Sequence, residues 1–284
     1  MARKCRVCQH GKGYAADPCS HYFLSIANTL NNSMTNLVDV SEYRACHGII
    51  LAGGCGARFG HARPKQLLEL SDNSVLGHTL RKFNLSPAID KIIVVAHKDH
   101  LEEVTAICRS AISDKPYVIT PGGANRNRSV EAAVRWLPPG RSKVIIHDAV
   151  RPFATLDLIG RVAHALDSAD AVIPVIESVD PIVEAHLGHV TGFIDRRTTF
   201  RGQSPQGFWS TDIRLALDSQ PGDVVDRTST VYELLTTAQP ALQIVTVPGE
   251  INNIKITVPV DELIATELFR LEQDCGHVTP RMPP

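Results

Sequence analysis

The sequence predicts an α/β fold whose mostly parallel sheet is covered by helices on both faces. Two observations support this prediction. Short runs of consecutive apolar residues recur along the chain, as in strands buried on both faces, and between them apolar residues recur every three or four positions, as in amphipathic helices. Alternation of these two patterns favours parallel strands joined by helical crossovers, which are almost always right-handed. We therefore expect a Rossmann-like sheet.

The individual elements follow in order over residues 47–272, which we expect to form one domain. Strands are predicted at 47–51, 91–96, 116–120, 143–147, 171–175 and 242–247, and helices around 74–85, 101–108, 130–136, 156–165, 215–217, 231–235 and 261–271. After the fifth strand the alternation stops, and short β-prone segments such as Pro181–Glu184 and His189–Ile194 follow. This stretch, roughly 177–208, is predicted to be a small antiparallel β-arm that leaves the sheet.

The composition argues against several classes of protein. The chain has 284 residues, of which 43% are apolar and 21% charged, as in ordinary globular domains. Its net charge of -1 provides no general positive field that would attract nucleic acid or an anionic membrane. No apolar run approaches the ~20 residues that cross a bilayer. Seven irregularly spaced cysteines argue against a disulfide framework and favour the reducing cytoplasm.

The two ends of the chain differ from this domain. Residues 1–46 are polar and lack periodicity, so we expect a disordered or weakly ordered extension. Alternatively, translation starts at Met34, or a small zinc site is formed by the first cysteines and histidines, which are Cys5, Cys8, His10, Cys19 and His21. Residues 273–284 are rich in proline and are predicted to be a mobile tail.

A glycine-rich loop suggests that the chain binds an anion. The first strand runs directly into Gly53 and Gly54, and two cations, Arg58 and Lys65, follow. Backbone N–H groups of such a loop can turn toward an anion without interference from Cβ atoms, and the cations can approach from two sides, as in a polyphosphate site. The alternatives are an ordinary tight turn and solvated surface cations. Cys55 is interpreted as a small loop residue, with a reactive thiol as the alternative.

Further polar clusters follow other predicted strands. They comprise Gly122, Gly123, Arg126 and Ser129 after the third strand, His147, Asp148 and Arg151 after the fourth, and Asn253 and Lys255 after the last. Ligands bind beyond the carboxyl ends of strands in open parallel sheets, so we expect these clusters to form one site. The alternatives are a plain turn at Gly122, a helix cap at Asp148 and a surface ion pair between Asp148 and Arg151. His147 is interpreted as structural.

Two common nucleotide-binding motifs do not fit this sequence. No Gly-Lys-Ser/Thr occurs, which excludes a Walker A loop, and the spacing of Gly54, Gly56 and Gly60 is one residue too long for the dinucleotide fingerprint. The second strand ends without the acidic residue that would bind a ribose hydroxyl. A nicotinamide oxidoreductase is therefore disfavoured.

Seven ordered motifs instead resemble those of one enzyme family. They are Ala52-Gly53-Gly54-x-Gly56-x-Arg58, Pro64-Lys65-Gln66, Gly122-Gly123-x-x-Arg126-x-x-Ser129, His147-Asp148-x-x-Arg151-Pro152, Asp195-Arg196, Ser204-Pro205-Gln206-x-Phe208 and Asn253-Ile254-Lys255-Ile256-Thr257. Over residues 47–272 the chain resembles the cytidylyltransferases that activate polyol phosphates, which include the methylerythritol-phosphate enzyme of isoprenoid synthesis and ribitol-5-phosphate cytidylyltransferase. The resemblance implies that CTP and a polyol phosphate react to give a CDP-polyol and pyrophosphate, with Mg²⁺ as the metal.

The resemblance also implies roles for individual residues. Arg58, Lys65, Arg196 and Lys255 would be the catalytic residues, the first two by holding the triphosphate and stabilising the transition state. CTP would be bound by Ala52, Gly53, Gly54, Gly122, Gly123, Arg126, Ser129 and Asp148, and the acceptor by Arg151, Arg196, Ser204 and Lys255. Asp148 would be the residue nearest the metal. Arg196 would come from the β-arm, which in this family reaches across a homodimer.

Two departures from the family pattern bear on the acceptor. Methylerythritol enzymes usually carry Thr where this chain has Pro181, which offers no hydroxyl, and Ser204 replaces a more usual Thr. Other details, such as Arg126-Asn127 and Gly202-Gln203-Ser204, resemble the ribitol enzymes more closely. We therefore expect D-ribitol 5-phosphate as the acceptor. The alternatives are 2-C-methyl-D-erythritol 4-phosphate, another phosphorylated or phosphonate acceptor, and a non-catalytic nucleotide-binding relative.

Overall fold

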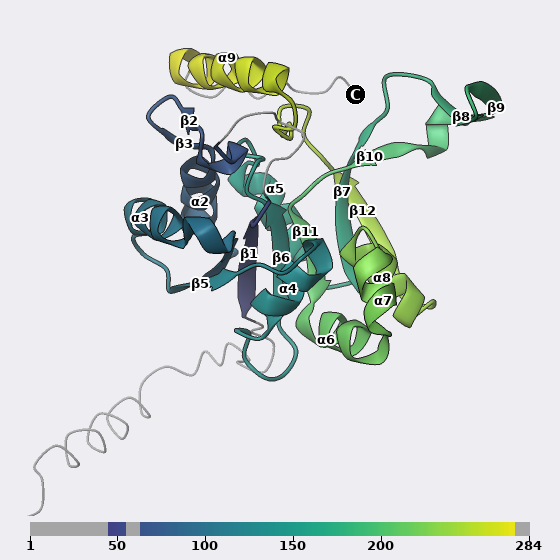
Figure 1. The fold of residues 1–284 in the computed structure, drawn as a ribbon, viewed down its shortest axis with the longest axis horizontal. Coiled ribbons are helices and arrows are strands. Elements are labelled where there is room, and N and C mark those ends of the chain that lie inside the picture. The colour runs from purple at the N-terminus through teal and green to yellow at the C-terminus, as the bar shows by residue number, and fades with distance from the viewer. Residues whose placement is uncertain (1–44, 55–62, 276–284) are drawn as a thin grey trace, which may run out of the picture. The chain divides into compact units, whose positions relative to one another are not determined.

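The structure is a computed structural model that describes residues 45–54 and 63–275 (Figure 1). Within these residues the central sheet has eight strands in the order β10-β7-β11-β6-β1-β4-β5, with β12 paired to β7. The strands are β1 (Cys46–Ala52), β4 (Lys91–Ala96), β5 (Tyr117–Pro121), β6 (Lys143–Asp148), β7 (Ala171–Glu177), β10 (Phe200–Gly202), β11 (Gln206–Trp209) and β12 (Ile244–Pro248). The pairs β1–β4, β1–β6, β4–β5 and β7–β12 are parallel, whereas β10 and β11 pair antiparallel to their neighbours. The predicted mostly parallel α/β sheet is therefore confirmed.

Some of the expectations fall on parts of the chain that the structure does not describe. Arg58, Cys55, the candidate zinc residues and the segment 276–284 lie outside the described residues. The expectations for these residues remain predictions.

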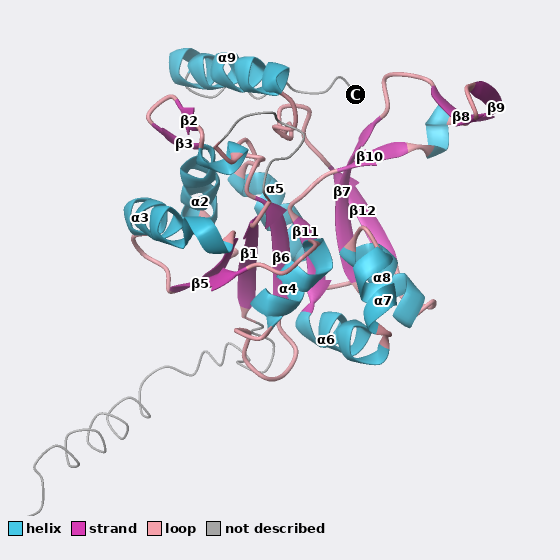
Figure 2. Ribbon diagram, in the orientation of Figure 1, coloured by secondary structure: helices cyan, strands magenta, loops and turns pink. Residues whose placement is uncertain are grey.

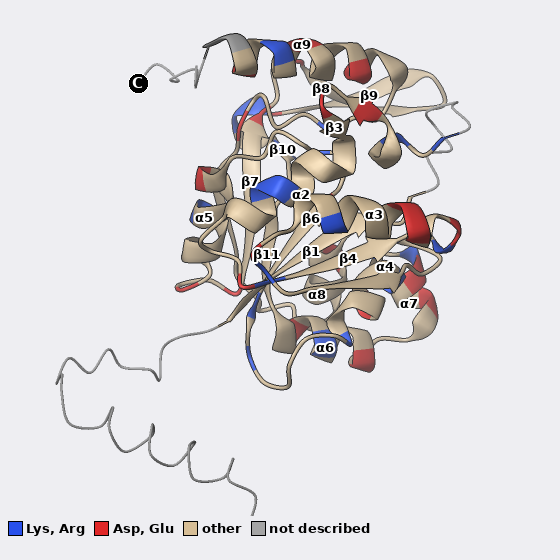
Figure 3. Ribbon diagram, turned by 90° about the vertical axis from the view of Figure 1, so that its left-hand side faces the viewer, with Lys and Arg blue, Asp and Glu red and all other residues tan. Residues whose placement is uncertain are grey.

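Helices cover both faces of the sheet (Figure 2). One apolar core packs α2 (Val75–Leu85), α3 (Leu101–Ala111) and α5 (Leu156–Ala165) against one face, and the other core packs α4 (Arg126–Val134), α6 (Ser210–Ser219) and α8 (Val231–Ala238) against the opposite face. Ile49 and Ile93 enter the second core, whereas Ile50 and Ile92 enter the first. Because successive side chains of a strand point to opposite faces, both faces of β1 and β4 must be apolar, which explains their continuous apolar runs. In Figure 3 these strands are almost free of charged residues.

Only part of the stretch 177–208 leaves the sheet. β8 (Ile182–His186) and β9 (His189–Ile194) form an antiparallel hairpin that extends away from the sheet in Figure 1. The predicted end of the arm at residue 208 was wrong, because β10 pairs with the end of β7 and β11 lies between β6 and β7. Phe208 and Trp209 enter opposite cores, and their burial holds this short strand in the sheet. Below, "the arm" means residues 178–199.

Other boundaries also differ from the prediction. α4 ends at Val134, and Trp136, which was assigned to this helix, is 50% exposed. A short helix that was not predicted, α7 (Gly222–Arg227), precedes α8. The last helix, α9 (Pro259–Cys275), includes the first three residues of the predicted tail. Residues 252–257 form a loop without a strand.

Candidate active site

The carboxyl ends of neighbouring strands bring the two glycine loops together. β1 lies between β4 and β6, and Leu51 is in register with Asp148 at the end of β6. On the other side, the N–H of Gly122 donates to the carbonyl of Ala96 at the end of β4 at 2.8 Å. A Cβ atom built on Gly53 would lie only 3.9 Å from the Cα of Gly122. The loops that follow β1 and β5 are therefore in contact, as the topology predicted.

Gln66 holds the described part of the first glycine loop. This residue lies in the 3₁₀ helix η2 (Lys65–Leu67), and its buried amide donates to the carbonyls of Ala52 and Gly54, both at 2.8 Å. One side-chain amide thus satisfies two loop carbonyls. The segment that leads from β1 toward residue 55 is therefore held in one defined position.

The second glycine loop is a tightly packed turn. A Cβ atom on Gly123 would lie 2.3 Å from the Cβ of Arg128, so only glycine fits at this position. The N–H of Gly123 donates to the Ser129 hydroxyl at 3.2 Å, and this hydroxyl donates to the Asn125 carbonyl at 2.8 Å. Asn125 in turn caps α4, because its side chain accepts from the N–H of Arg128 at 2.9 Å. Gly122, Gly123 and Ser129, all predicted for CTP binding, therefore belong to one rigid unit.

Asp148 brings three of the predicted cations together. Arg126 donates from Nη1 to Oδ1 of Asp148, and Lys255 Nζ lies 2.8 Å from Oδ2. Arg151 Nε lies 3.8 Å from the same Oδ2. The Asp148 side chain is 11% exposed, whereas those of Arg126 and Lys255 are 25% and 39% exposed. The carboxylate is thus enclosed, while two of its cations remain accessible to a ligand.

These cations keep Asp148 ionised. Burial alone would raise the pKa of this carboxyl, but the charges of Arg126 and Lys255 and their hydrogen bonds more than offset that effect and hold the pKa well below its usual range. Three cations therefore surround one anion. The resulting excess of positive charge suits the binding of phosphate groups.

Arg151 and His147 support each other beneath this cluster. Arg151 Nη1 donates to the backbone carbonyl of Asn253 at 2.7 Å, and the backbone carbonyl of Arg151 lies 3.0 Å from His147 Nε2. Because a carbonyl only accepts, the proton of the neutral His147 ring must lie on Nε2. Burial lowers the pKa of Arg151 and lowers that of His147 to about 4. His147 is therefore neutral near pH 7 and holds a backbone carbonyl, which confirms the structural interpretation.

Ser204 and Gln206 hold the cluster from the side of β11. The Ser204 hydroxyl accepts from the backbone N–H of Asp148 at 3.1 Å, and the side-chain oxygen Oε1 of Gln206 accepts from Arg126 Nη2 at 3.1 Å. Ser204 is only 1% exposed. In this structure it therefore fixes the backbone of Asp148, and its contact with an acceptor remains a prediction.

Lys65 lies near the beginning of α9. Burial alone would raise the pKa of Asp261, but hydrogen bonds from Thr257 and Val258 and the charge of Lys65 lower it. The Thr257 hydroxyl also lies 3.4 Å from the carbonyl of Lys255. The charge of Lys65 is therefore close enough to act on Asp261, and η2 lies beside the first glycine loop through Gln66.

Arg196 is the predicted site residue that the structure leaves apart from Asp148. It lies in the 3₁₀ helix η4 (Arg196–Thr198) within the arm, where it is exposed. The neighbouring Arg197 pairs with Asp195 at 2.7 Å. Within one copy of the chain, the described contacts of Asp148 involve Arg126, Arg151 and Lys255 but not Arg196.

Asp148 is the residue that the family resemblance places nearest to a metal ion. Among the described residues, no group of three or more His, Cys, Asp or Glu side chains could hold a metal by itself. A single carboxylate fits Mg²⁺, which in nucleotide sites takes most of its ligands from phosphates and water. Both oxygens of Asp148 contact cations here, so a metal ion would share the carboxylate with Arg126 and Lys255.

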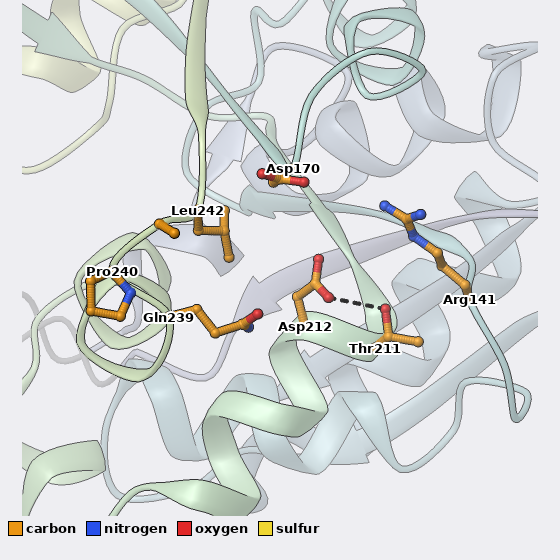
Figure 4. A pocket seen from close by; sticks show the side chains of 8 residues that line it. Arg141, Asp170, Thr211, Asp212, Gln239, Pro240 and Leu242 are labelled. Atoms are coloured by element: carbon orange, nitrogen blue, oxygen red, sulfur yellow. Dashed lines mark hydrogen bonds between the residues drawn. The ribbon is translucent and has the colours of Figure 1, made fainter.

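A separate cavity of about 510 Å³ lies elsewhere in the fold (Figure 4). It is lined by Asp170, Thr211, Asp212 and Leu242 among others, and Asp170 and Leu242 lie just before the amino ends of β7 and β12. The candidate site lies at the carboxyl ends of the strands. We therefore assign the chemistry to the Asp148 cluster, which contains the cations and glycine turns that phosphate binding requires, and not to this cavity.

Sequence reasoning gave no role to several residues that organise the site. Gln66, Gln206 and Asn253 stood inside the quoted motifs, but only their neighbours were assigned functions. Their polar side chains, one or two positions from predicted site residues, were an available signal. The partners, which lie 12 to 102 positions away in these hydrogen bonds, were not available from the sequence.

The fold and this site define a nucleotide-binding α/β protein whose cations and glycine backbone are arranged to receive phosphates. Residues 46–271 match the 2-C-methyl-D-erythritol 4-phosphate cytidylyltransferase family, IspD. The chain belongs to this family, which confirms the resemblance stated from its motifs.

The relatives include enzymes with different named acceptors. The chain is 34% identical over 233 residues to ribitol-5-phosphate cytidylyltransferase of Streptococcus pneumoniae (strain Hungary19A-6), which covers 78% of this chain and 97% of that protein. It is 35% identical over 229 residues to the bifunctional ribulose 5-phosphate reductase/CDP-ribitol pyrophosphorylase Bcs1 of Haemophilus influenzae, covering 78% of this chain but only 48% of that relative. The chain thus spans about half of Bcs1.

A solved structure agrees with this assignment. The crystal structure of 4-diphosphocytidyl-2C-methyl-D-erythritol synthase from Anaerococcus prevotii DSM 20548 superposes with a TM-score of 0.68 at 26% identity, covering 80% of this chain and 96% of that one.

The described residues contain no helix with both the length and the apolar character needed to cross a bilayer.

Proposed function

We propose that this chain transfers CMP from CTP to the phosphate of a polyol phosphate, giving a CDP-polyol and pyrophosphate. The observation that carries this proposal is the enclosed Asp148 with Arg126, Arg151 and Lys255 around it, at the strand ends that also hold two glycine loops. Cations from separate elements can hold two phosphate-bearing substrates against their mutual repulsion.

The reaction needs little covalent chemistry from the protein. An oxygen of the acceptor phosphate, already ionised near neutral pH, attacks the α-phosphorus of CTP. The new P–O bond forms as the bond from the α-phosphorus to the bridging oxygen breaks, and pyrophosphate leaves with that electron pair. Catalysis then consists of alignment and of neutralising negative charge in the transition state.

The residues divide into a donor side and an acceptor side. Lys65 and Arg58 hold the triphosphate beside the first glycine loop, and the Gly122-Gly123 turn borders the cytosine and ribose. Arg151 and Lys255 hold the acceptor phosphate. Arg126, which contacts Asp148 and Gln206, belongs to the donor side of this proposal.

Mg²⁺ would be held chiefly by the triphosphate, with Asp148 as the nearest carboxylate of the protein. When bound, it supplies additional neutralisation of phosphate charge. The residues of the chain supply the orientation. Asp148 holds Arg126 and Lys255 at the strand ends.

D-ribitol 5-phosphate is the acceptor that we favour. Relatives named for ribitol 5-phosphate or CDP-ribitol are 34% and 35% identical to this chain. Pro181, in the segment where methylerythritol enzymes usually offer a Thr hydroxyl, also favours a different polyol. The second candidate acceptor is 2-C-methyl-D-erythritol 4-phosphate, because the matched family and the Anaerococcus prevotii enzyme carry its name.

A homodimer is also part of this proposal. The arm exposes several apolar side chains, among them Leu187 (85%), Val190 (57%) and Phe193 (83%). An isolated two-stranded hairpin is marginally stable, and exposed apolar patches mark interaction surfaces. A second copy that covers the arm would bring Arg196 toward the partner's site. The irregularly spaced cysteines support a cytoplasmic location.

Pyrophosphate release from the purified chain tests this function. The chain should release pyrophosphate with CTP, Mg²⁺ and D-ribitol 5-phosphate, and 2-C-methyl-D-erythritol 4-phosphate is the parallel arm of the assay. Equal turnover with ATP, GTP and UTP, or tight CTP binding without turnover of any acceptor, would contradict the proposal. The second outcome would favour the non-catalytic alternative.

A further inference from the structure

Several hydrogen bonds around the acceptor side converge on Asn253. This residue is fully buried, at 0% exposure. Its side-chain Nδ2 donates to the backbone carbonyl of Ser204 at 2.8 Å, and the backbone carbonyl of Asn253 accepts from Arg151 Nη1 at 2.7 Å. Lys255 follows two residues later and contacts Asp148 at 2.8 Å. One asparagine thus connects Ser204, Arg151 and the loop that carries Lys255.

Gln203 strengthens the same connection. Its Nε2 donates to the carbonyl of Glu250 at 2.8 Å, and its Oε1 accepts from the N–H of Glu250 at 3.0 Å. The same Oε1 also lies 3.4 Å from Asn253 Nδ2. A Cβ atom on Gly249 would lie 2.6 Å from Gln203 Oε1, so the loop backbone passes very close to this side chain. Residues 249–255 are therefore held against the segment 203–204.

We propose that Asn253 is a positioning residue that sets Arg151 and Lys255 for the acceptor phosphate; this inference rests on the proposed function. Its side-chain amide, which carries no charge, holds residue 253 against Gln203 and Ser204, and the backbone carbonyl of the same residue accepts from Arg151. The Oδ1 atom of Asn253 is buried and has no hydrogen-bond partner among the described residues. A buried acceptor left unpaired is unfavourable, so the side chain at this position is not optimised for stability alone.

The substitution Asn253→Asp tests this role with almost no change in size. A carboxylate cannot donate to the Ser204 carbonyl, and it adds a negative charge beside Arg151. We expect the Kd for D-ribitol 5-phosphate, measured by titration calorimetry, to rise at least 10-fold, while the Kd for CTP changes less than 3-fold. Asn252→Asp is the matched control, because it adds the same charge one residue away on a half-buried side chain. An unchanged acceptor Kd in Asn253→Asp would overturn the inference.

A double-mutant cycle separates positioning from a merely structural effect. If Asn253 acts through Lys255 as well as through Arg151, the effects of Asn253→Asp and Lys255→Ala on the acceptor Kd should combine to clearly less than their product. If the two effects multiply instead, Asn253 does not act through Lys255 and the inference fails. Should Asn253→Asp not fold, Asn253→Ser replaces it in the same cycle, because it removes the side-chain amide that donates to the Ser204 carbonyl and adds no charge.

Chemical labelling of Lys255 in the absence of any acceptor tests this inference separately from the proposed function. The rate at which an acylating reagent modifies Lys255, followed by mass spectrometry, should change at least 3-fold in Asn253→Asp and stay within 1.5-fold in Asn252→Asp. A wild-type chain that neither binds nor turns over any polyol phosphate contradicts the proposed function, and the labelling rates then still decide the geometry. A wild-type chain that is active, with an Asn253→Asp variant equal to it in all measurements, contradicts the inference alone.

Discussion

Replacing Asp148 by Asn would remove the anion at the centre of three cations. In the structure its Oδ2 lies 2.8 Å from Lys255 Nζ and 3.8 Å from Arg151 Nε, and its Oδ1 contacts Arg126. Removing one partner of a fully buried ion pair costs about 3–5 kcal/mol. Because Arg126 and Lys255 are 25% and 39% exposed, water screens part of the remaining repulsion, and we expect a loss of about 2–3 kcal/mol. For a domain of this size that corresponds to a fall in Tm of roughly 4–12 °C.

Thermal unfolding of the Asp148→Asn variant at low and high salt checks this reasoning. Salt should reduce the difference from wild type, because it screens the repulsion among the cations. Inorganic pyrophosphate should stabilise the variant more than the wild type, because it supplies the missing negative charge. Asp72→Asn is the control, since Asp72 pairs with Arg81 at 2.9 Å but is 58% exposed and should contribute less than about 1 kcal/mol. A Tm within 2 °C of wild type, or a difference that salt leaves unchanged, would refute the role of Asp148 as the neutralising centre.

Four further outcomes are expected. Lys65→Ala should reduce kcat at least 100-fold with a Tm drop of only a few degrees, because its charge makes only a minor contribution at Asp261 but holds the triphosphate; full activity in the pyrophosphate assay would remove Lys65 from the mechanism. Gln66→Leu should raise the KM for CTP about 10-fold more than the KM for the acceptor, because the loop carbonyls of Ala52 and Gly54 lose their donor; equal changes in both would speak against this. Burial lowers the pKa of His147 from 6.5 to about 4, so the unfolded state binds more protons than the folded state between these pH values. The stability that the neutral ring supplies is therefore complete above pH 6.5 and falls by up to about 3 kcal/mol as the pH drops to 4. Urea unfolding of His147→Gln should lack this component, and an identical pH profile would contradict it. Phe193→Asp, on the exposed arm, should turn a dimer into a monomer in analytical ultracentrifugation with a Tm drop below 3 °C, and a dimer that persists would place the interface elsewhere.

The central strands could be predicted because their burial leaves a local pattern. β1, β4 and β6 face apolar cores on both sides, so they consist of consecutive apolar residues. β11 has no such pattern: it is four residues long and includes Gly207, and it belongs to the sheet because Phe208 and Trp209 fill the two cores. Its place between β6 and β7 depends on contacts with residues that are distant in sequence, which periodicity does not report.

The location of the site was predictable for a different reason. The carboxyl ends of parallel strands share one edge of the sheet, so Gly122, Asp148 and Lys255 could be expected near one another. The pairing within that edge was not predictable. Asp148 was considered as a CTP-binding residue, a metal neighbour, a helix cap or the partner of Arg151 in a surface ion pair, whereas the structure encloses it between Arg126 and Lys255 as well as near Arg151. The roles of Gln66 and Asn253 appear only once their backbone partners are known.

The arm enters and leaves the sheet through one pair of strands. Val175 to Glu177 of β7 pair with Gly202 to Phe200 of β10, so the two ends of the arm are held side by side. The cost of closing a chain segment between two fixed ends grows only slowly with its length. The arm can therefore lengthen, shorten or change its sequence during evolution without moving Asp148 or Ser204. Selection can therefore reshape the arm without disturbing the Asp148 cluster, and a short turn joining residues 177 and 200 would give the same domain without the arm, which would lack Arg196 as well.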